Sequence, residues 1–322
     1  MITAVDWEKL LTVDYGKAVE LFTSQAAYTD SKLQIRGYTI PFSGTQQRFD
    51  SLMQFLRRQL LRYVFPEKER PDDIDWAVAR DKFGDNDPAS DGKLGEMLLY
   101  VFVEAFLKTP LMAYKLKDLG NPNDQVKGAD AVFVGEYNGQ PALLIGESKI
   151  HQKLSSAINR AIESLQRFHE RSGPYANELL IARKYPSERG LSADALDSAY
   201  AIIGGNTGVL VHPVFVSYDF SQIPAISRQA TDCALAEKAL KQKLMHEIAQ
   251  WKEAIESLGE KFPKPFQVFL DFFFLPVEDS MQLRNHFYEM LHGHPYESAA
   301  VRGAVKKVKQ EIKKAESKGD NG

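Results

Sequence analysis

The chain has 322 residues, of which 44% are hydrophobic and 26% are charged, and it contains one cysteine. This composition excludes a disordered, collagen-like or disulfide-stapled protein, and the length suffices for one large domain or two. No stretch reaches the roughly 18 uncharged apolar residues of a membrane helix, and the N-terminus lacks a signal-peptide pattern, so we expect a cytoplasmic protein without a membrane partner. The 40 basic and 43 acidic side chains give a formal charge of −3, which does not indicate a general nucleic-acid binder.

Helical spacing of apolar residues dominates the first part of the chain, and we expect residues 1–85 to form an N-terminal, mostly helical region. The clearest stretch runs from about 46 to 64 and ends before the charged segment EKERPDD. This predicted helix carries a basic cluster, Arg57, Arg58 and Arg62. A solvated helix face explains the cluster, and contact with phosphate is the alternative.

The middle of the chain alternates helix-like and strand-like patterns. The patterns predict a helix over LGEMLLYVFVEAFL, a strand over LMAYKL, two strands joined by Asn138-Gly139, a helix from about 154 to 171, strands over VLVHPVFVSYDF and FQVFLDFFFLPV with a helix from about 230 to 258 between them, and a last helix over DSMQLRNHFYEMLH. The order predicts an α/β domain with a mixed sheet over 86–280, then a C-terminal helical segment and a basic polar tail over 281–322. Cys233 has no partner cysteine, and we expect it to be a small core residue.

The Asn138-Gly139 pair predicts the geometry of a hairpin. A two-residue type I′ turn pairs residues whose numbers sum to 277, which places Asp130 opposite Glu147. Strand alternation then places Lys149 on the same face as Glu147. Two carboxylates that face each other repel, so a compensating charge is expected there.

A divalent cation such as Mg²⁺ is the natural compensation, because it binds one or two carboxylates together with water and phosphate oxygens. Lys149 would then orient or deprotonate the attacking water, which points to phosphodiester hydrolysis. The tripeptide (Asp or Glu)-x-Lys occurs five times in the chain, so only its position in the hairpin gives the copy at Glu147 its weight. A structural ion pair at the end of a sheet is the alternative.

This arrangement is similar to the PD-(D/E)xK nuclease core, and the segments LGEMLLYVFVEAFL, KGADAVFV and LLIGESKIH resemble the HamA family, the nuclease subunit of the Hachiman anti-phage defence system. The resemblance implies a restriction-endonuclease-like core with a mixed central sheet flanked by helices. It implies that Asp130, Glu147 and Glu96 bind Mg²⁺, with Mn²⁺ as a possible substitute, and that Lys149 is the catalytic lysine. It also implies a heterodimer with a helicase subunit that restrains the nuclease or delivers it to DNA.

Several further residues are weaker candidates. Glu96 rests mostly on the resemblance, because a glutamate beside an apolar helix stripe is usually solvated. Gln166 lies where related nucleases sometimes carry a polar accessory residue, and His151 reaches the active face if its strand continues. Ser148 alternates away from Glu147, and its carbonyl is a possible metal ligand.

The hypothesis is therefore a Mg²⁺-dependent DNA nuclease that acts in anti-phage defence with a helicase partner. The alternative is a non-catalytic assembly or regulatory subunit with a structural Asp/Glu/Lys cluster. Hydrolysis of RNA would use the same residues, and the sequence contains nothing that recognises or excludes a 2′-hydroxyl.

Overall fold

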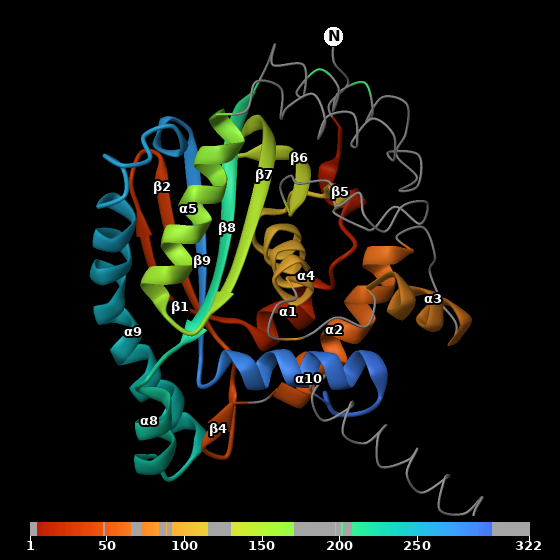
Figure 1. Ribbon diagram of the computed structural model, residues 1–322, viewed down its shortest axis with the longest axis vertical. Coiled ribbons are helices and arrows are strands. Elements are labelled where there is room, and N and C mark those ends of the chain that lie inside the picture. Colours follow the sequence, from red (N-terminus) through yellow and green to blue (C-terminus); the bar gives the residue numbers. More distant parts are fainter. Residues whose placement is uncertain are drawn as a thin grey trace, which may run out of the picture.

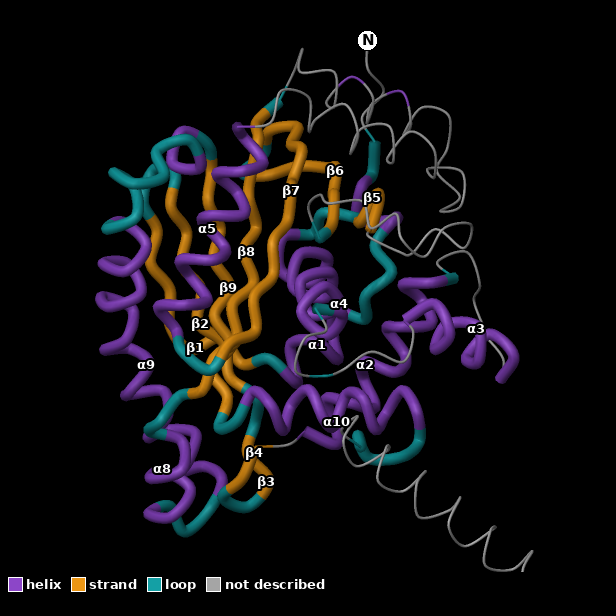
Figure 2. Tube along the Cα trace, viewed as in Figure 1, coloured by secondary structure: helices purple, strands orange, loops and turns teal. Residues whose placement is uncertain are grey.

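A computed structural model describes residues 5–47, 49–65, 73–83, 88, 92–114, 130–170, 197, 201 and 208–297. Its centre is a seven-stranded mixed sheet with the strand order β1-β2-β9-β8-β7-β6-β5 (Figure 2). The strands are β1 (Thr23–Thr29), β2 (Leu33–Thr39), β5 (Leu111–Tyr114), β6 (Ala131–Tyr137), β7 (Gln140–His151), β8 (Val209–Asp219) and β9 (Phe269–Val277). β2, β9, β8 and β7 are parallel to one another, whereas β1, β6 and β5 pair antiparallel to their neighbours.

Helices cover both faces of this sheet (Figure 1). One face carries α5 (Leu154–Glu170) and α9 (Cys233–Glu256), and we call it the α5 face. The other carries α4 (Lys93–Phe102), which continues as a π-helical turn over Val103–Leu107, and we call it the α4 face. The remaining elements are α1 (Tyr15–Leu21), α2 (Phe49–Val64), α3 (Asp73–Phe83), α8 (Ile223–Gln229), α10 (Ser280–His292), the 3-10 turns Trp7–Leu10 and Pro265–Gln267, and a small hairpin of β3 (Phe42–Ser43) and β4 (Gln46–Gln47).

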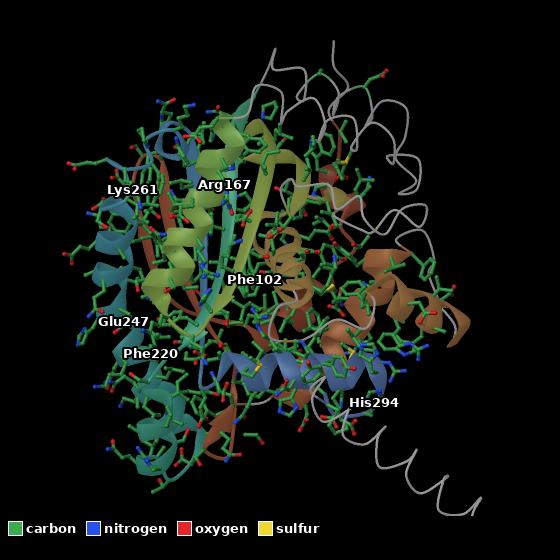
Figure 3. All side chains as sticks on the ribbon, viewed as in Figure 1. Phe102, Arg167, Phe220, Glu247, Lys261 and His294 are labelled. Carbon is green, nitrogen blue, oxygen red and sulfur yellow. The ribbon has the colours of Figure 1, made fainter. Side chains whose placement is uncertain are left out.

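Aromatic side chains fill the layer between α4 and the sheet. Phe102, labelled in Figure 3, lies with its ring centroid 5.1 Å from that of Phe215 on β8 and 5.6 Å from that of Phe273 on β9. Because β8 and β9 are covered on both faces, their side chains are apolar almost throughout, as expected for central parallel strands. β8 pairs directly with β7, so this buried core adjoins the strand that carries Glu147 and Lys149.

Polar groups buried in the α4 face form a fully bonded cluster. Asp271 on β9 accepts hydrogen bonds from Arg36 Nε on its Oδ1 and from Arg36 Nη2 on its Oδ2, each at 2.9 Å. The hydroxyl of Tyr137 donates a third bond to Oδ2 at 3.0 Å. Both oxygens of this completely buried carboxylate therefore have donors, and one positive charge balances one negative charge.

Most of the predicted elements are confirmed, because the helices α2, α4, α5, α9 and α10 and the strands β5 to β9 lie where the patterns place them. The N-terminal region differs from the prediction. It contains helices, but β1 and β2 also extend the central sheet through β9, so the first 85 residues are not a separate helical unit. The segments TSQAAYT and LQIRGYT carry few large apolar residues, and a partner more than two hundred residues away stabilises them.

The prediction that Cys233 is a small core residue is wrong. Cys233 is exposed at the first position of α9. Asp232 caps this helix by accepting the N–H of Leu235, so the chain begins the helix at the surface. The predicted loop over KDLGNPNDQVKG and the basic C-terminal tail lie outside the described residues. Within the described part of the chain, no helix is long and apolar enough to cross a membrane.

Candidate functional site

The hairpin of β6 and β7 sets the register of the site. Asn138 and Gly139 both have positive φ values, 51° and 74°, as a type I′ turn requires. Tyr137 pairs with Gln140, and the ladder continues to the pair of Ala131 and Gly146. The predicted register, in which the paired residue numbers sum to 277, is confirmed from the turn as far as this pair, and it does not extend to Asp130 and Glu147.

Asp130 directly precedes β6 and lies beside Glu147. Its N–H donates to the carbonyl of Gly146 at 3.1 Å, although Gly146 is already the partner of Ala131, so the regular ladder ends at that pair. Its carboxylate Oδ2 accepts two hydrogen bonds from Ser148, one from the N–H and one from Oγ, each at 2.8 Å. Because Ser148 alternates away from Glu147, Asp130 leans toward the α4 face instead of standing on the Glu147 face as the alternation predicts. In the described part of the chain, Oδ1 of Asp130 has no hydrogen-bond donor.

Glu147 and Lys149 stand on the opposite face of β7, which α5 covers. Lys149 Nζ donates to Glu147 Oε1 and also to the carbonyl of Ser148 at 3.1 Å. The exposed fractions of the side chains are 8% for Glu147 and 24% for Lys149. The carboxylate is thus buried, whereas the ammonium group of Lys149 keeps access to solvent.

The electrostatics of Glu147 distinguish it from an ordinary ion-pair partner. Burial and then the negative charge of Asp130 raise the pKa of Glu147 to about 7, against the lowering effects of Lys149 and of the Ser164 hydroxyl on α5. Glu147 thus has a second carboxylate near it as well as the cation of Lys149. Perturbation of this kind is common at functional sites.

Glycine at position 95 determines how closely α4 approaches the site. A Cβ atom at Gly95 would lie 2.8 Å from Oγ of Ser148, so any larger residue requires the serine or the helix to shift. The next residue, Glu96, is buried and forms an ion pair with Lys93 at 2.9 Å. The structure therefore brings Asp130, Glu147 and Lys149 together at the end of the hairpin. It places Glu96 on the α4 face, toward which the Asp130 carboxylate leans, and metal binding by Glu96 stays a prediction.

Comparison with protein families gives a match over residues 17–291, from α1 to α10. The chain belongs to the HamA family. This family is the anti-phage defence subunit of the Hachiman system, as the resemblance of the three sequence segments predicts. The matched range includes the whole sheet and the Asp130, Glu147 and Lys149 side chains. A comparison with curated proteins finds no match.

In this HamA-family chain, the residue of α5 that contacts Glu147 is Ser164. Its hydroxyl bonds to Glu147 and accepts a hydrogen bond from Arg167 Nη2 at 3.0 Å (Figure 3 labels Arg167). The predicted accessory residue, Gln166, instead bonds to Glu170 at 2.7 Å and to the N–H of Lys264 at 3.3 Å. Sequence reasoning missed Ser164, although it lies at the border of the buried stripe of α5, where a polar side chain can reach the sheet.

The described residues of this HamA-family structure contain no group of three or more His, Cys, Asp or Glu side chains that could hold a metal ion. A metal at this site would therefore have two carboxylate ligands, from Asp130 and Glu147, and would take its other ligands from water or substrate. Mg²⁺ is commonly bound in this way. Oδ1 of Asp130, which accepts no hydrogen bond from the described residues, and the second carboxylate near Glu147 both fit such an ion.

Proposed function

We propose that this HamA-family protein is a Mg²⁺-dependent nuclease, with a restriction-endonuclease-like core, that hydrolyses phosphodiester bonds of DNA. The observation that carries the proposal is the convergence of Asp130, Glu147 and Lys149 at the end of one hairpin. Glu147 is buried beside a second carboxylate, an arrangement that costs stability and that a bound cation relieves. Two carboxylates and a lysine on neighbouring strands also match the PD-(D/E)xK pattern that the sequence resembles.

In this mechanism, Asp130 and Glu147 would hold the metal, and Ser148 holds Asp130 through its N–H and Oγ. A bound Mg²⁺ supplies a Lewis acid that polarises the phosphate and lowers the pKa of water. Lys149 Nζ lies against Glu147 Oε1 and remains partly exposed, so it can orient the attacking water and offset charge that develops on the phosphate. The hydroxyl of Ser164 on α5 bonds to the Glu147 carboxylate and holds its position.

A helicase partner belongs to the same proposal. The formal charge of −3 supplies no strong attraction for DNA, and affinity for DNA grows with the number of phosphates that a protein neutralises. We therefore propose that the helicase subunit of the defence system delivers DNA to this chain or restrains it until DNA is engaged. Membership of a defence-subunit family supports a partner of this kind.

A specific observation favours the alternative, a non-catalytic assembly or regulatory subunit. Glu147 already has an ion-pair partner in Lys149, and the described residues offer only two carboxylates rather than a complete ligand set. In that case the cluster stabilises the end of the sheet, and divalent cations change neither stability nor activity.

The test is cleavage of plasmid and linear DNA by the purified full-length chain with Mg²⁺ or Mn²⁺, with and without the helicase subunit. Glu147→Ala and Lys149→Ala are compared with the wild type, and Glu136→Ala and Lys241→Ala are matched controls, because both of these side chains are exposed and lie outside the site. We expect metal-dependent cleavage that both site variants lose and both controls keep. We also expect Mg²⁺ to raise the melting temperature of the wild type by mass action.

Each other result has a definite meaning. Cleavage that survives in Glu147→Ala or Lys149→Ala shows a contaminant or a misplaced site. Cleavage that appears only when the helicase is removed or triggered supports restraint, and cleavage that requires the helicase supports delivery. No cleavage under any condition, together with a melting temperature that Mg²⁺ does not change, establishes the non-catalytic alternative.

A further inference from the structure

Two basic side chains, His151 and Arg160, lie beyond Lys149, where β7 ends. β7 continues to His151, which pairs with Tyr218 of β8, so His151 stands on the same face as Glu147 and Lys149. It lies about 6.6 Å further along the strand than Lys149, given the rise of about 3.3 Å per residue. The predicted condition for His151 to reach the active face is therefore met.

Helix α5 brings an arginine to the same place. It starts three residues after β7 ends and runs back along the strand (Figure 1). Since Ser164 bonds to Glu147, Arg160, one helical turn earlier, lies over the end of β7. The pKa of His151 is lowered by burial first and then by the positive charges of Arg160, Arg284 and Lys149, which agrees with this placement.

Two other positive charges at this end of the sheet have defined contacts. Lys149 pairs with Glu147, and Arg284 on α10 donates to the carbonyls of Ile150 and Pro88 at 2.8 and 2.6 Å. In the described part of the chain, Arg160 and His151 have no carboxylate within ion-pair distance and no hydrogen-bond partner. Arg160 is exposed and His151 is half-buried, so both can receive a ligand.

We propose that His151 and Arg160 form a subsite for a backbone phosphate of the nucleic acid, next to the phosphate that is cleaved. The inference rests on the proposed nuclease function and assigns two residues that contact the substrate. A nucleic-acid strand that enters the site must bring its phosphates close to Asp130 and Glu147, which repel them. Arg160 supplies a charge-assisted bond and His151 a neutral N–H donor at the adjacent position along the strand.

The basic cluster on α2 is a weaker candidate for this role, because internal contacts already engage it. The guanidinium of Arg57 stacks 4.6 Å above the Trp76 ring, and Arg62 Nη1 donates to the carbonyl of Thr12 at 2.7 Å. Arg58 is exposed on the α4 face side of the molecule, away from Lys149. It therefore provides a matched control for Arg160.

The test measures binding separately from cleavage. Fluorescence anisotropy of the full-length chain with labelled single- and double-stranded DNA and with RNA of the same sequence, in EDTA, is compared for wild type, Arg160→Ala, Arg160→Lys, His151→Gln and Arg58→Ala. We expect Arg160→Ala to weaken binding about tenfold at 0.1 M salt and to reduce the slope of log K against log salt by about 1. Arg160→Lys restores most of the slope, His151→Gln weakens binding less than Arg160→Ala, and Arg58→Ala has no effect.

The outcomes separate this inference from the proposed function. Equal weakening by Arg58→Ala and Arg160→Ala shows diffuse attraction and overturns the subsite, as does a wild type that binds no oligonucleotide at low salt. If Arg160→Ala binds normally while Glu147→Ala is inactive, the nuclease stands and the subsite falls. If Arg160→Ala weakens binding and no protein cleaves, the phosphate site stands without the nuclease. The RNA arm decides which polymer supplies the phosphate.

Discussion

Two buried carboxylates on the central sheet, Asp271 and Glu147, have similar burial and opposite surroundings. Asp271 receives three hydrogen bonds, two of them from Arg36. Glu147 is bonded to Lys149 and Ser164 but stands beside Asp130, a second negative charge. Burial raises the pKa of both carboxyl groups, yet the largest opposing influence at Asp271 is a cation, whereas the second contribution at Glu147 is a carboxylate that raises its pKa further.

Because the pKa is raised at both carboxyl groups, a perturbed pKa does not by itself identify a functional site. The two groups differ in the balance of charge around them. A structural carboxylate is matched by donors on every oxygen, because an unmatched buried charge costs several kcal/mol. A carboxylate with a like charge beside it is stabilised by a proton or a bound cation, and this distinguishes the Glu147 cluster from the Asp271 cluster.

The largest expected effect on stability comes from breaking the balanced cluster. Asp271→Ala leaves the Arg36 guanidinium and the Tyr137 hydroxyl without their acceptor, so we expect the free energy of unfolding to fall by about 3–5 kcal/mol. Glu147→Ala removes a group that Asp130 repels, so we expect a change below about 1 kcal/mol together with a loss of cleavage. Urea denaturation at pH 7.5 measures both.

The triple variant Arg36→Met, Asp271→Leu, Tyr137→Phe is the control for that prediction. It removes all three polar partners together, and we expect it to recover most of the lost stability. If Glu147→Ala were as destabilising as Asp271→Ala, the two clusters would both be structural and the comparison would fail.

A smaller effect is expected at the contact between α4 and the site. Gly95→Ala places a Cβ atom 2.8 Å from Oγ of Ser148, so either the serine or the helix must shift. We expect a loss of about 1–3 kcal/mol in stability and a fall in cleavage, because Ser148 also holds Asp130.

Adding Ser148→Ala to Gly95→Ala tests whether the clash is the cause. The second substitution removes the Oγ atom that the new methyl group meets, so we expect the double variant to lose less stability than the sum of the two single variants. Additive losses would show that Gly95 acts through the helix backbone instead.

Much of the site was predictable because local chemistry determines it. Asn138 and Gly139 adopt the positive φ values that only a few residue types tolerate, and this turn alone sets the register that brings Asp130 beside Glu147. The strand face of Lys149 then follows from alternation. The family resemblance added Glu96, which forms an ion pair with Lys93, and its part in the site stays a prediction.

The parts that sequence reasoning missed depend on contacts between distant segments. The sequence of β2 alone gives no strong strand pattern. Its place in the sheet depends on pairing with β9, where Arg36 bonds to Asp271, 235 positions later in the chain. Ser164 becomes part of the site only through the way α5 packs on β7. The rotation of Asp130 toward Ser148 occurs outside the strand ladder, where alternation no longer fixes a side chain.

A third polar cluster contains the buried His212 on β8 together with His169 on α5, and it contains no carboxylate. His212 Nδ1 bonds to the carbonyl of Ile145 at 3.0 Å, and its Nε2 lies 2.9 Å from Nε2 of His169. Burial lowers the pKa of His212 to about 3, and the charge of His169 contributes in the same direction. The unfolded chain, with a histidine pKa of about 6.5, therefore binds one more proton between those two pH values.

Stability from His212 is thus fully present above pH 6.5 and is lost as the pH falls toward 3. We expect the free energy of unfolding of the wild type to fall by about 1.4 kcal/mol per pH unit more than that of His212→Gln across this window. Urea denaturation at pH 7.5, 6 and 5 measures the difference in slope. His246→Gln is the control because His246 is exposed, and equal slopes in all three proteins would contradict the prediction.

The smallest expected effect concerns Ser164, which supports the unbalanced carboxylate from α5. Ser164→Ala removes one hydrogen bond from Glu147 and the acceptor of Arg167, worth about 1 kcal/mol, so we expect cleavage to slow about fivefold. Stability should change little, because the Arg167 side chain is exposed and water can replace the lost bond. Ser164→Thr keeps the hydroxyl and should restore the rate, and Ser155→Ala, an exposed serine on the same helix, should leave it unchanged. A slow Ser164→Ala variant that Ser164→Thr does not rescue would mean that packing, rather than the bond to Glu147, matters at this position.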